Sequence, residues 1–286
     1  MKILTFDIED WFHILDNPDT KGVSQWSGFE SRLAQNMDTI FEILEETNQK
    51  ATFFVVGWIA EKHPDQVRRI VEAGHEIGSH THLHQLIYEQ SPQDFDEDLK
   101  RSIQTLENVT GSKVKIFRAP GFSLTSQTPW AFESLLNQGV EIDCSIFPAS
   151  RSHGGFENFG GAEPTIVEYD GMLIKEFPIN TTKSFGKEII FSGGGYFRLF
   201  PYSSIQSFTK RSDYIMTYFH PRDFDPNQPM VPGLGPIRKF KSYYGLSKTK
   251  NKLKKWIHEF EFIDLQTADK KINWLDANKL NLSNNS

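Results

Sequence analysis

The chain has 286 residues and a formal net charge of −6, with 38% hydrophobic and 13% aromatic residues. This composition suits one sizeable α/β domain, and the acidic balance argues against nucleic-acid binding. The longest apolar run, Ala51 to Ala60, is too short to cross a bilayer. No secretory signal precedes the first strand pattern, and the one cysteine, Cys144, excludes a disulfide framework. We therefore expect a cytoplasmic protein without a transmembrane segment.

One stretch departs from the acidic balance. Residues 238–255 carry eight basic side chains, namely Arg238, Lys239, Lys241, Lys248, Lys250, Lys252, Lys254 and Lys255. A solvated helix face is the favoured interpretation of this run. Contact with an acidic surface or a glycolipid head group is the alternative.

The first half alternates strand and helix patterns. Strands are predicted over 3–7, 51–56, 76–79, 114–118 and 140–143, and helices over 29–47, 59–73, 92–110 and 125–137. Ser91 followed by Pro92 is typical of a helix start. This alternation predicts an α/β fold with parallel strands and helices outside.

The second half is less regular. Residues 149–200 are rich in glycine and aromatic residues, and we expect loops and hairpins inserted beside the site. A strand is predicted over 214–219, a helix over 247–258 and a late strand over 259–265. No linker interrupts residues 1–277, which predicts a single domain, and residues 278–286 are expected to form a polar, disordered tail.

Polar clusters follow two of the predicted strands. Asp7, Glu9 and Asp10 follow the first, and His80 and His84 follow the strand at 76–79. The carboxyl ends of parallel strands share one edge of a sheet, where the chemistry of such folds is found. Two histidines four residues apart, together with one carboxylate, form a typical ligand set for a catalytic divalent metal.

Three further polar residues lie at strand ends: Arg118, Asp143 and His220. Each has a structural interpretation, because Arg118 could be an ion-pair partner, Asp143 could cap a turn and His220 could be packed in the core. Their occurrence with the two clusters favours a shared site.

Taken in order, these motifs resemble those of the NodB-type polysaccharide deacetylases, carbohydrate esterase family 4. Within that family the opening resembles the subgroup associated with exopolysaccharide and cell-envelope glycans. The resemblance covers residues 1–225 and rests on Thr5-Phe6-Asp7-Ile8-Glu9-Asp10-Trp11-Phe12, His80-Thr81-His82-Leu83-His84, Arg118-Ala119-Pro120-Gly121 and Tyr218-Phe219-His220. It implies a distorted, incomplete (β/α)7-type barrel.

The resemblance also implies a metal site. His80 and His84 match the family's two histidine ligands. The family's metal aspartate usually follows the base aspartate directly, but Ile8 stands there, so Glu9 or Asp10 must supply the carboxylate. Strand alternation favours Glu9, whereas residue type favours Asp10. Zn²⁺ is the expected ion, with Co²⁺ or another first-row ion as the alternative.

The remaining roles are also implied by the resemblance. Asp7 matches the catalytic base, Arg118 its ion-pair partner and His220 the general acid. Asp143 lies where an aspartate orients the acid histidine, although the family's neighbouring tryptophan is missing. Phe219 stands where leucine is usual.

Together these features predict a hydrolase that uses metal-bound water, an Asp base and a His acid to remove an N-acetyl group from an amino sugar. The expected substrate is an N-acetylated sugar, oligosaccharide or lipid-linked glycan in exopolysaccharide biosynthesis. Two alternatives are a deformylase-like or allantoinase-like hydrolase of the same fold, and an inactive carbohydrate-binding homologue.

Overall fold

The structure is a computed structural model that describes residues 1–15, 17–149, 154–184 and 187–283. Its main sheet has the strand order β12-β7-β8-β6-β5-β4-β3-β2. The strands are β2 (Thr5–Ile8), β3 (Thr52–Val55), β4 (Glu76–Ser79), β5 (Ile116–Phe117), β6 (Ile142–Asp143), β7 (Thr165–Tyr169), β8 (Met172–Glu176) and β12 (Asn278–Asn281). Neighbouring strands are parallel except in the β7–β8 hairpin, which confirms a mixed α/β fold with a mostly parallel sheet.

The parallel register aligns the carboxyl ends of the five consecutive strands β2 to β6. Ile8 pairs with Val55, Val55 with Ser79, Ser79 with Phe117, and Phe117 with Asp143. Strands β2 and β3 are buried along their whole length, as expected for a sheet covered on both faces. The residue that follows each strand therefore projects at one common edge.

A late segment of the chain returns beside the first strands and extends the curved row of strands. Strand β1 (Lys2–Ile3) pairs in parallel with β11 (Ile215–Met216), and a bridge joins Phe6 to Phe219. The Thr5 N–H donates to the Thr217 hydroxyl oxygen at 2.7 Å. This pairing brings His220, which follows Phe219, to the edge where β2 ends.

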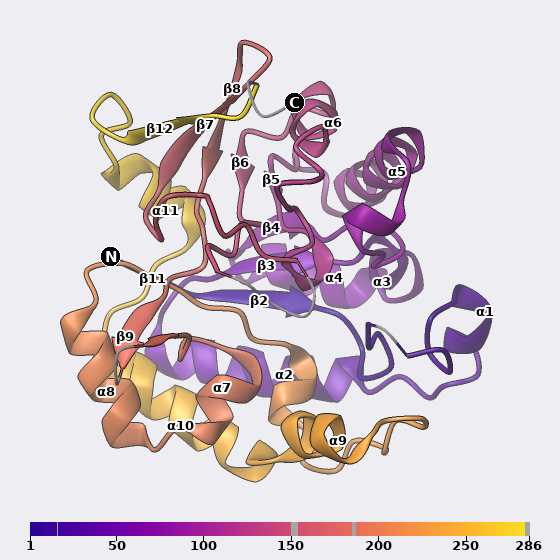
Figure 1. The fold of residues 1–286 in the computed structure, drawn as a ribbon. Coiled ribbons are helices and arrows are strands. Elements are labelled where there is room, and N and C mark those ends of the chain that lie inside the picture. Colours follow the sequence, from indigo (N-terminus) through magenta and orange to yellow (C-terminus); the bar gives the residue numbers. More distant parts are fainter. Residues whose placement is uncertain (16, 150–153, 185–186, 284–286) are drawn as a thin grey trace.

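Helices surround the curved sheet (Figure 1). They are α1 (Val23–Trp26), α2 (Leu33–Thr47), α3 (Gly57–Lys62), α4 (Pro64–Glu72), α5 (Pro92–Thr110), α6 (Ala131–Asn137), α7 (Gly194–Leu199), α8 (Tyr202–Arg211), α9 (Pro236–Tyr243), α10 (Leu246–Glu259) and α11 (Leu265–Lys271). Helix α5 has the bounds predicted from sequence. The helix predicted over 59–73 is two helices, because Pro64 cannot continue the hydrogen-bond ladder of α3.

The second half holds more regular structure than its sequence indicates. It contains the β7–β8 hairpin and a second hairpin of β9 (Thr182–Ser184) and β10 (Lys187–Ile189), as expected for an insertion. It also contains helices α7, α8, α9 and α11, which were not predicted. Among the described helices, none has the length and apolar character to cross a membrane.

The expectation of a disordered tail is wrong for residues 278–283. Strand β12 pairs in parallel with β7, and the Leu282 N–H donates to the Glu168 carbonyl oxygen at 2.9 Å. Leu282 is 5% exposed. The edge of β7 that faces away from β8 offers backbone hydrogen-bond partners to this polar segment. Local composition cannot reveal such a contact. Residues 284–286 lie outside the described part of the chain.

Candidate metal centre and active site

Three side chains at the sheet edge form a possible metal site. Glu9, His80 and His84 each offer one ligand atom, and these atoms lie within 4.8 Å of one another. All three residues are buried, and the His84 Nε2 atom lies 2.7 Å from a Glu9 carboxylate oxygen. This is the two-nitrogen, one-oxygen set that the histidine spacing predicts.

The protonation states of His80 and Glu9 suit a cation. The His80 Nδ1–H donates to the Arg118 carbonyl oxygen at 2.7 Å, because a carbonyl can only accept, and this leaves the Nε2 lone pair for the ligand position. Burial holds the pKa of His80 well below its usual range. Although burial opposes ionisation of Glu9, the neighbouring His84 lowers the pKa of that carboxyl to about 2. A neutral imidazole and an ionised carboxylate are the forms that bind metal.

The histidine loop is shaped from outside by Asp98 of α5. Its carboxylate accepts hydrogen bonds from the backbone N–H groups of His82 and Leu83, at 2.6 and 2.9 Å. The backbone φ angles of Thr81 and His84 are 62° and 53°, so the loop holds two non-glycine residues in the left-handed region. These anchors let His80 and His84 face the same point. Asp98 was not predicted from sequence, because it lies on a distant helix.

The intervening His82 points away from the site. Its Nε2 atom lies 3.5 Å from a Glu61 carboxylate oxygen, and its ring packs against Gly57. A Cβ atom at Gly57 would lie 2.4 Å from His82 Nδ1, so this close approach requires glycine.

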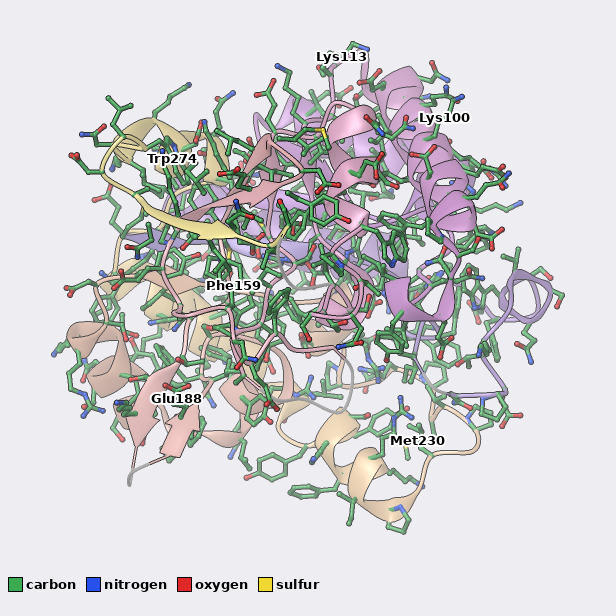
Figure 2. The ribbon with its side chains drawn as sticks, turned by 45° about the horizontal axis from the view of Figure 1, so that its top comes forward. Lys100, Lys113, Phe159, Glu188, Met230 and Trp274 are labelled. Carbon is green, nitrogen blue, oxygen red and sulfur yellow. The ribbon has the colours of Figure 1, made fainter. Side chains whose placement is uncertain are left out.

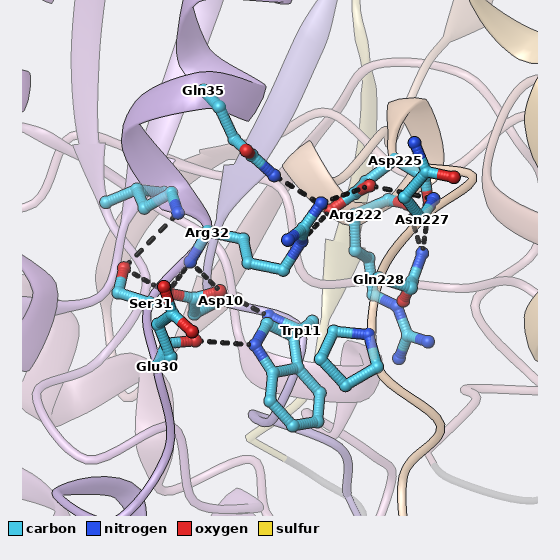
Figure 3. A network of polar contacts seen from close by, with 12 residues as sticks. Asp10, Trp11, Glu30, Ser31, Arg32, Gln35, Arg222, Asp225, Asn227 and Gln228 are labelled. Carbon is cyan, nitrogen blue, oxygen red and sulfur yellow. Dashed lines mark hydrogen bonds and ion pairs between the residues drawn. The ribbon is translucent and has the colours of Figure 1, made fainter.

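Asp10, the alternative carboxylate ligand, belongs to a different network (Figure 3). Its carboxylate accepts hydrogen bonds from the Trp11 N–H, the Ser31 hydroxyl and the Arg32 N–H. The Arg32 guanidinium in turn pairs with Asp225. The geometry therefore brings Glu9 to the histidines and uses Asp10 to fix the turn after β2. Asp7 and Glu9 face the cavity together, as strand alternation indicates.

Asp7 forms a buried ion pair with Arg118. The Arg118 Nη1 atom donates to an Asp7 carboxylate oxygen at 2.7 Å and to the Thr5 hydroxyl oxygen at 2.8 Å. Arg118 is fully buried, and its guanidinium lies 4.1 Å from the centre of the Phe54 ring. The apolar surroundings strengthen the pairing and leave one Asp7 oxygen facing the cavity.

His220 lies opposite Asp7. Its Nε2 atom is 3.8 Å from the second Asp7 oxygen and 4.0 Å from a Glu9 oxygen. Its Nδ1 atom lies 3.2 Å from an Asp223 carboxylate oxygen, and Asp223 also pairs with the buried Arg198. Burial disfavours the charged imidazole, but the hydrogen bond to Asp223 and the nearby carboxylates prevail and raise the pKa of His220 to about 9.

The prediction that Asp143 orients His220 is not supported by the geometry. Asp143 is fully buried and accepts a hydrogen bond from the Ser145 hydroxyl at 2.5 Å, beside Glu176. Burial raises the pKa of Asp143. Asp223 makes the contact that was expected of Asp143. The signal was present in sequence, since His220, Pro221 and an acid at the third following position form a capping box.

A cavity of about 280 Å³ opens over these groups. Its wall includes Asp7, Glu9, His80, His84 and His220, and two arginines, Arg222 and Arg238, also line it. A neighbouring cavity of about 210 Å³ shares His13, Ile14, Leu15 and His84 and is lined by Trp26. The proposed ligands Glu9, His80 and His84 therefore share one accessible space with Asp7 and His220.

Comparison with known families agrees with this site. Residues 17–139 match the family described as polysaccharide deacetylase, and residues 144–270 match a domain of unknown function, DUF3473. The amino-terminal part of the chain is therefore similar to the polysaccharide deacetylase family over residues 17–139. The first match contains His80, His84 and Arg118, whereas His220 and Asp223 lie within the second.

Curated relatives match only part of the chain. A peptidoglycan-N-acetylglucosamine deacetylase of Bacillus cereus is 36% identical over 33% of this chain and 34% of its own length. A chitooligosaccharide deacetylase of Azorhizobium caulinodans is 29% identical over 32% of this chain and 52% of its own length. The chain thus aligns with between a third and about half of these two relatives.

Solved structures share the fold across the whole chain. A protein from Mycobacterium smegmatis assigned to the polysaccharide deacetylases superposes with a TM-score of 0.65, at 16% identity, over 97% of this chain and 91% of its own. A family 4 pseudoenzyme from Bacillus anthracis gives 0.51, at 13% identity, over 98% and 66%. At these identities the likeness concerns the fold alone.

The metal site predicts different effects for its two neighbouring acids. Glu9→Gln should weaken Zn²⁺ binding by more than about 100-fold, because it removes a ligand rather than a supporting contact. Asp10→Asn should keep the affinity within a few-fold, because its carboxylate faces Ser31 and Arg32. Zinc titration against a competing chelator measures both. Equal losses in the two variants would contradict the assignment of Glu9.

The Asp7–Arg118 pair predicts a large effect on stability. Arg118→Met should lower the free energy of unfolding by about 3–5 kcal/mol, because it leaves the Asp7 carboxylate buried without its partner. The matched control is Lys115→Met, which removes an exposed ion pair with Glu141 and should cost less than about 1 kcal/mol. Urea denaturation followed by circular dichroism compares them, and similar costs would argue against the pair's importance.

Proposed function

We propose that this chain is a metal-dependent deacetylase that removes the N-acetyl group of an amino sugar in a bacterial glycan or glycan precursor. The observation that carries the proposal is the placement of Asp7 and His220. They face each other beside the Glu9, His80 and His84 cluster, and each is held by its own buried partner, Arg118 or Asp223. A base and an acid on two sides of a Lewis-acid site suit hydrolysis of an amide.

Glu9, His80 and His84 would hold the ion, and Zn²⁺ or Co²⁺ suits such a donor set. A bound divalent ion supplies polarisation of a carbonyl oxygen and a lower pKa for water. The protein's part is to keep His80 neutral and oriented. It does so through burial and through the carbonyl of Arg118.

Asp7 is the proposed base. One of its oxygens is occupied by Arg118, so the other, which faces His220 and the cavity, would accept the proton of the attacking water. The adjacent guanidinium favours the ionised carboxylate that a base requires. Arg118 is therefore a positioning residue that acts through Asp7.

His220 is the proposed acid. Its Nε2 atom faces the cavity while Nδ1 is held by Asp223, and the pKa near 9 keeps the ring protonated at neutral pH. An amine is a poor leaving group unless it is protonated, so the C–N bond can break when Nε2 delivers its proton to nitrogen. The products are acetate and the free amino sugar.

The proposed substrate is an N-acetylated sugar within an oligosaccharide or a lipid-linked glycan. The names of the curated relatives support an amino-sugar substrate, because they describe deacetylases of peptidoglycan N-acetylglucosamine and of chitooligosaccharides. We also propose the exopolysaccharide-associated subgroup and a cytoplasmic location. The subgroup proposal rests on the opening motif, and the location proposal on the single cysteine, which suits a reducing compartment.

Acetate release tests the proposed reaction. The zinc-loaded protein should release acetate, not formate, from chitooligosaccharides, and His220→Ala should lower kcat by about 10²–10⁴-fold because it removes the general acid. Zinc content should not change in this variant, because His220 is not a ligand. Normal turnover by His220→Ala would refute its role. Zinc binding and glycan binding without acetate release would indicate an inactive homologue.

The contact between Asp223 and His220 predicts a shift in pH dependence. Activity that needs protonated His220 should fall on the alkaline side as that ring loses its proton. Asp223→Asn removes a charge that raises the pKa of His220, so the alkaline limb should move to lower pH. The measurement is the pH profile of kcat/KM. The control is Asp225→Asn, since Asp225 pairs with Arg32 instead, and an unmoved limb in Asp223→Asn would refute the contact's role.

A further inference from the structure

Helix α9 has no buried residue and carries an apolar stripe. Ile237 is 75% exposed and Phe240 is 55% exposed, and Tyr244 follows directly after the helix end at 47%. These positions are separated by three and four residues, so they lie on one face of the helix. The Phe240 and Tyr244 rings lie 4.9 Å apart, which makes this face continuous.

Exposed apolar side chains also lie on two segments that contact α9. The Arg198 guanidinium of α7 donates to the Lys241 and Ser242 carbonyl oxygens, which fixes α7 against the end of α9. Met230 lies in the loop before α9 (Figure 2). That loop is held by a hydrogen bond from the Val231 N–H to the Tyr243 hydroxyl oxygen. The α9 surface consists of six exposed side chains, namely Tyr196, Leu199, Met230, Ile237, Phe240 and Tyr244.

Basic residues dominate the sequence around the α9 surface, although the exposed Asp19 lies beside Gly233 in the loop before α9. Between Asp225 and Glu259 the sequence contains no acidic residue, although the whole chain has a net charge of −6. Structure divides the basic residues of this stretch into two groups. On α10, Lys250 and Lys254 pair with Glu42 and Glu46 of α2. In the described part of the chain, Lys239, Lys241 and Lys248 have no ion pair and are exposed.

We propose that the α9 surface docks on a bilayer of anionic lipids. Exposed aromatic and aliphatic side chains would enter the interfacial region, and the unpaired lysines would contact the head groups. The charge pattern favours an anionic bilayer over a second copy of the chain as the partner of this surface. A second copy of the chain would bring its own lysines against these lysines, whereas an anionic bilayer offers apolar depth beneath a negative surface.

Docking in this orientation has a consequence for the active site. The other side of α9 lines the cavity through Arg238 and Ser242. A bilayer on the α9 surface would therefore lie beside the cavity opening, where an amino sugar carried on a lipid could enter. This consequence rests on the proposed function, whereas the docking itself does not.

Vesicle co-sedimentation of the full chain tests the docking. The protein should sediment with phosphatidylglycerol vesicles, bind phosphatidylcholine vesicles much more weakly, and dissociate at high salt. Lys239→Gln/Lys241→Gln should weaken partitioning by about 30-fold, because each lysine near an anionic surface contributes about five-fold. Ile237→Ser/Phe240→Ser should also reduce binding. The size of this reduction should not vary with salt concentration as the effect of the lysine substitutions does, because it comes from lost apolar contacts.

Matched controls lie on the far side of the molecule. Leu275 is 90% exposed, and Lys270 and Lys271 are an exposed pair at the end of α11, away from α9 in Figure 1. Leu275→Ser and Lys270→Gln/Lys271→Gln should leave vesicle binding unchanged. Three outcomes would overturn the proposal: equal losses in test and control variants, no binding to anionic vesicles, or self-association through α9 without lipid. Loss of acetate release with vesicle binding retained would instead reject only the proposed function.

Discussion

The site depends on the buried guanidinium of Arg118. Its side chain holds Asp7, while its backbone carbonyl accepts the hydrogen bond that orients His80. Its backbone N–H donates to the Ser79 carbonyl oxygen, which aligns β5 with β4. One residue thus couples the proposed base, a metal ligand and the strand register. A shift of β5 along β4 would displace the base and the ligand together.

The acid is built separately from the base and the metal ligands. His220 follows a segment that pairs with β1 and β2, and its partners Asp223 and Arg198 lie in the part of the chain that matches DUF3473. The deacetylase-family match ends before these residues. The domain of unknown function therefore completes the cavity and cannot be regarded as an appendage of the site.

Sequence predicted those features that depend on local pattern and strand alternation. The order of the early strands, the bounds of α5 and the meeting of Asp7 with His80 and His84 at one cavity follow from patterns of a few residues. Alternation along the first strand favoured Glu9, which the structure places beside the two histidines, whereas residue type favoured Asp10. The contribution of Asp98 could not be predicted, because a carboxylate on a helix has many possible partners and only packing selects the histidine loop. The predicted contact between Asp143 and His220 is absent for the same reason, because burial beside Glu176 decides the contacts of Asp143.

The basic stretch shows why composition alone could not distinguish a solvated helix from a binding surface. Lys250 and Lys254 fulfil the first interpretation, since α2 offers an acid opposite each of them. Lys239 and Lys241 share the same local composition but lie on α9, which packs no residue into the core. A helix with no fully buried residue gains little apolar burial for the side-chain and backbone entropy it loses, so its exposed aromatic face is best explained by a surface that covers it in function.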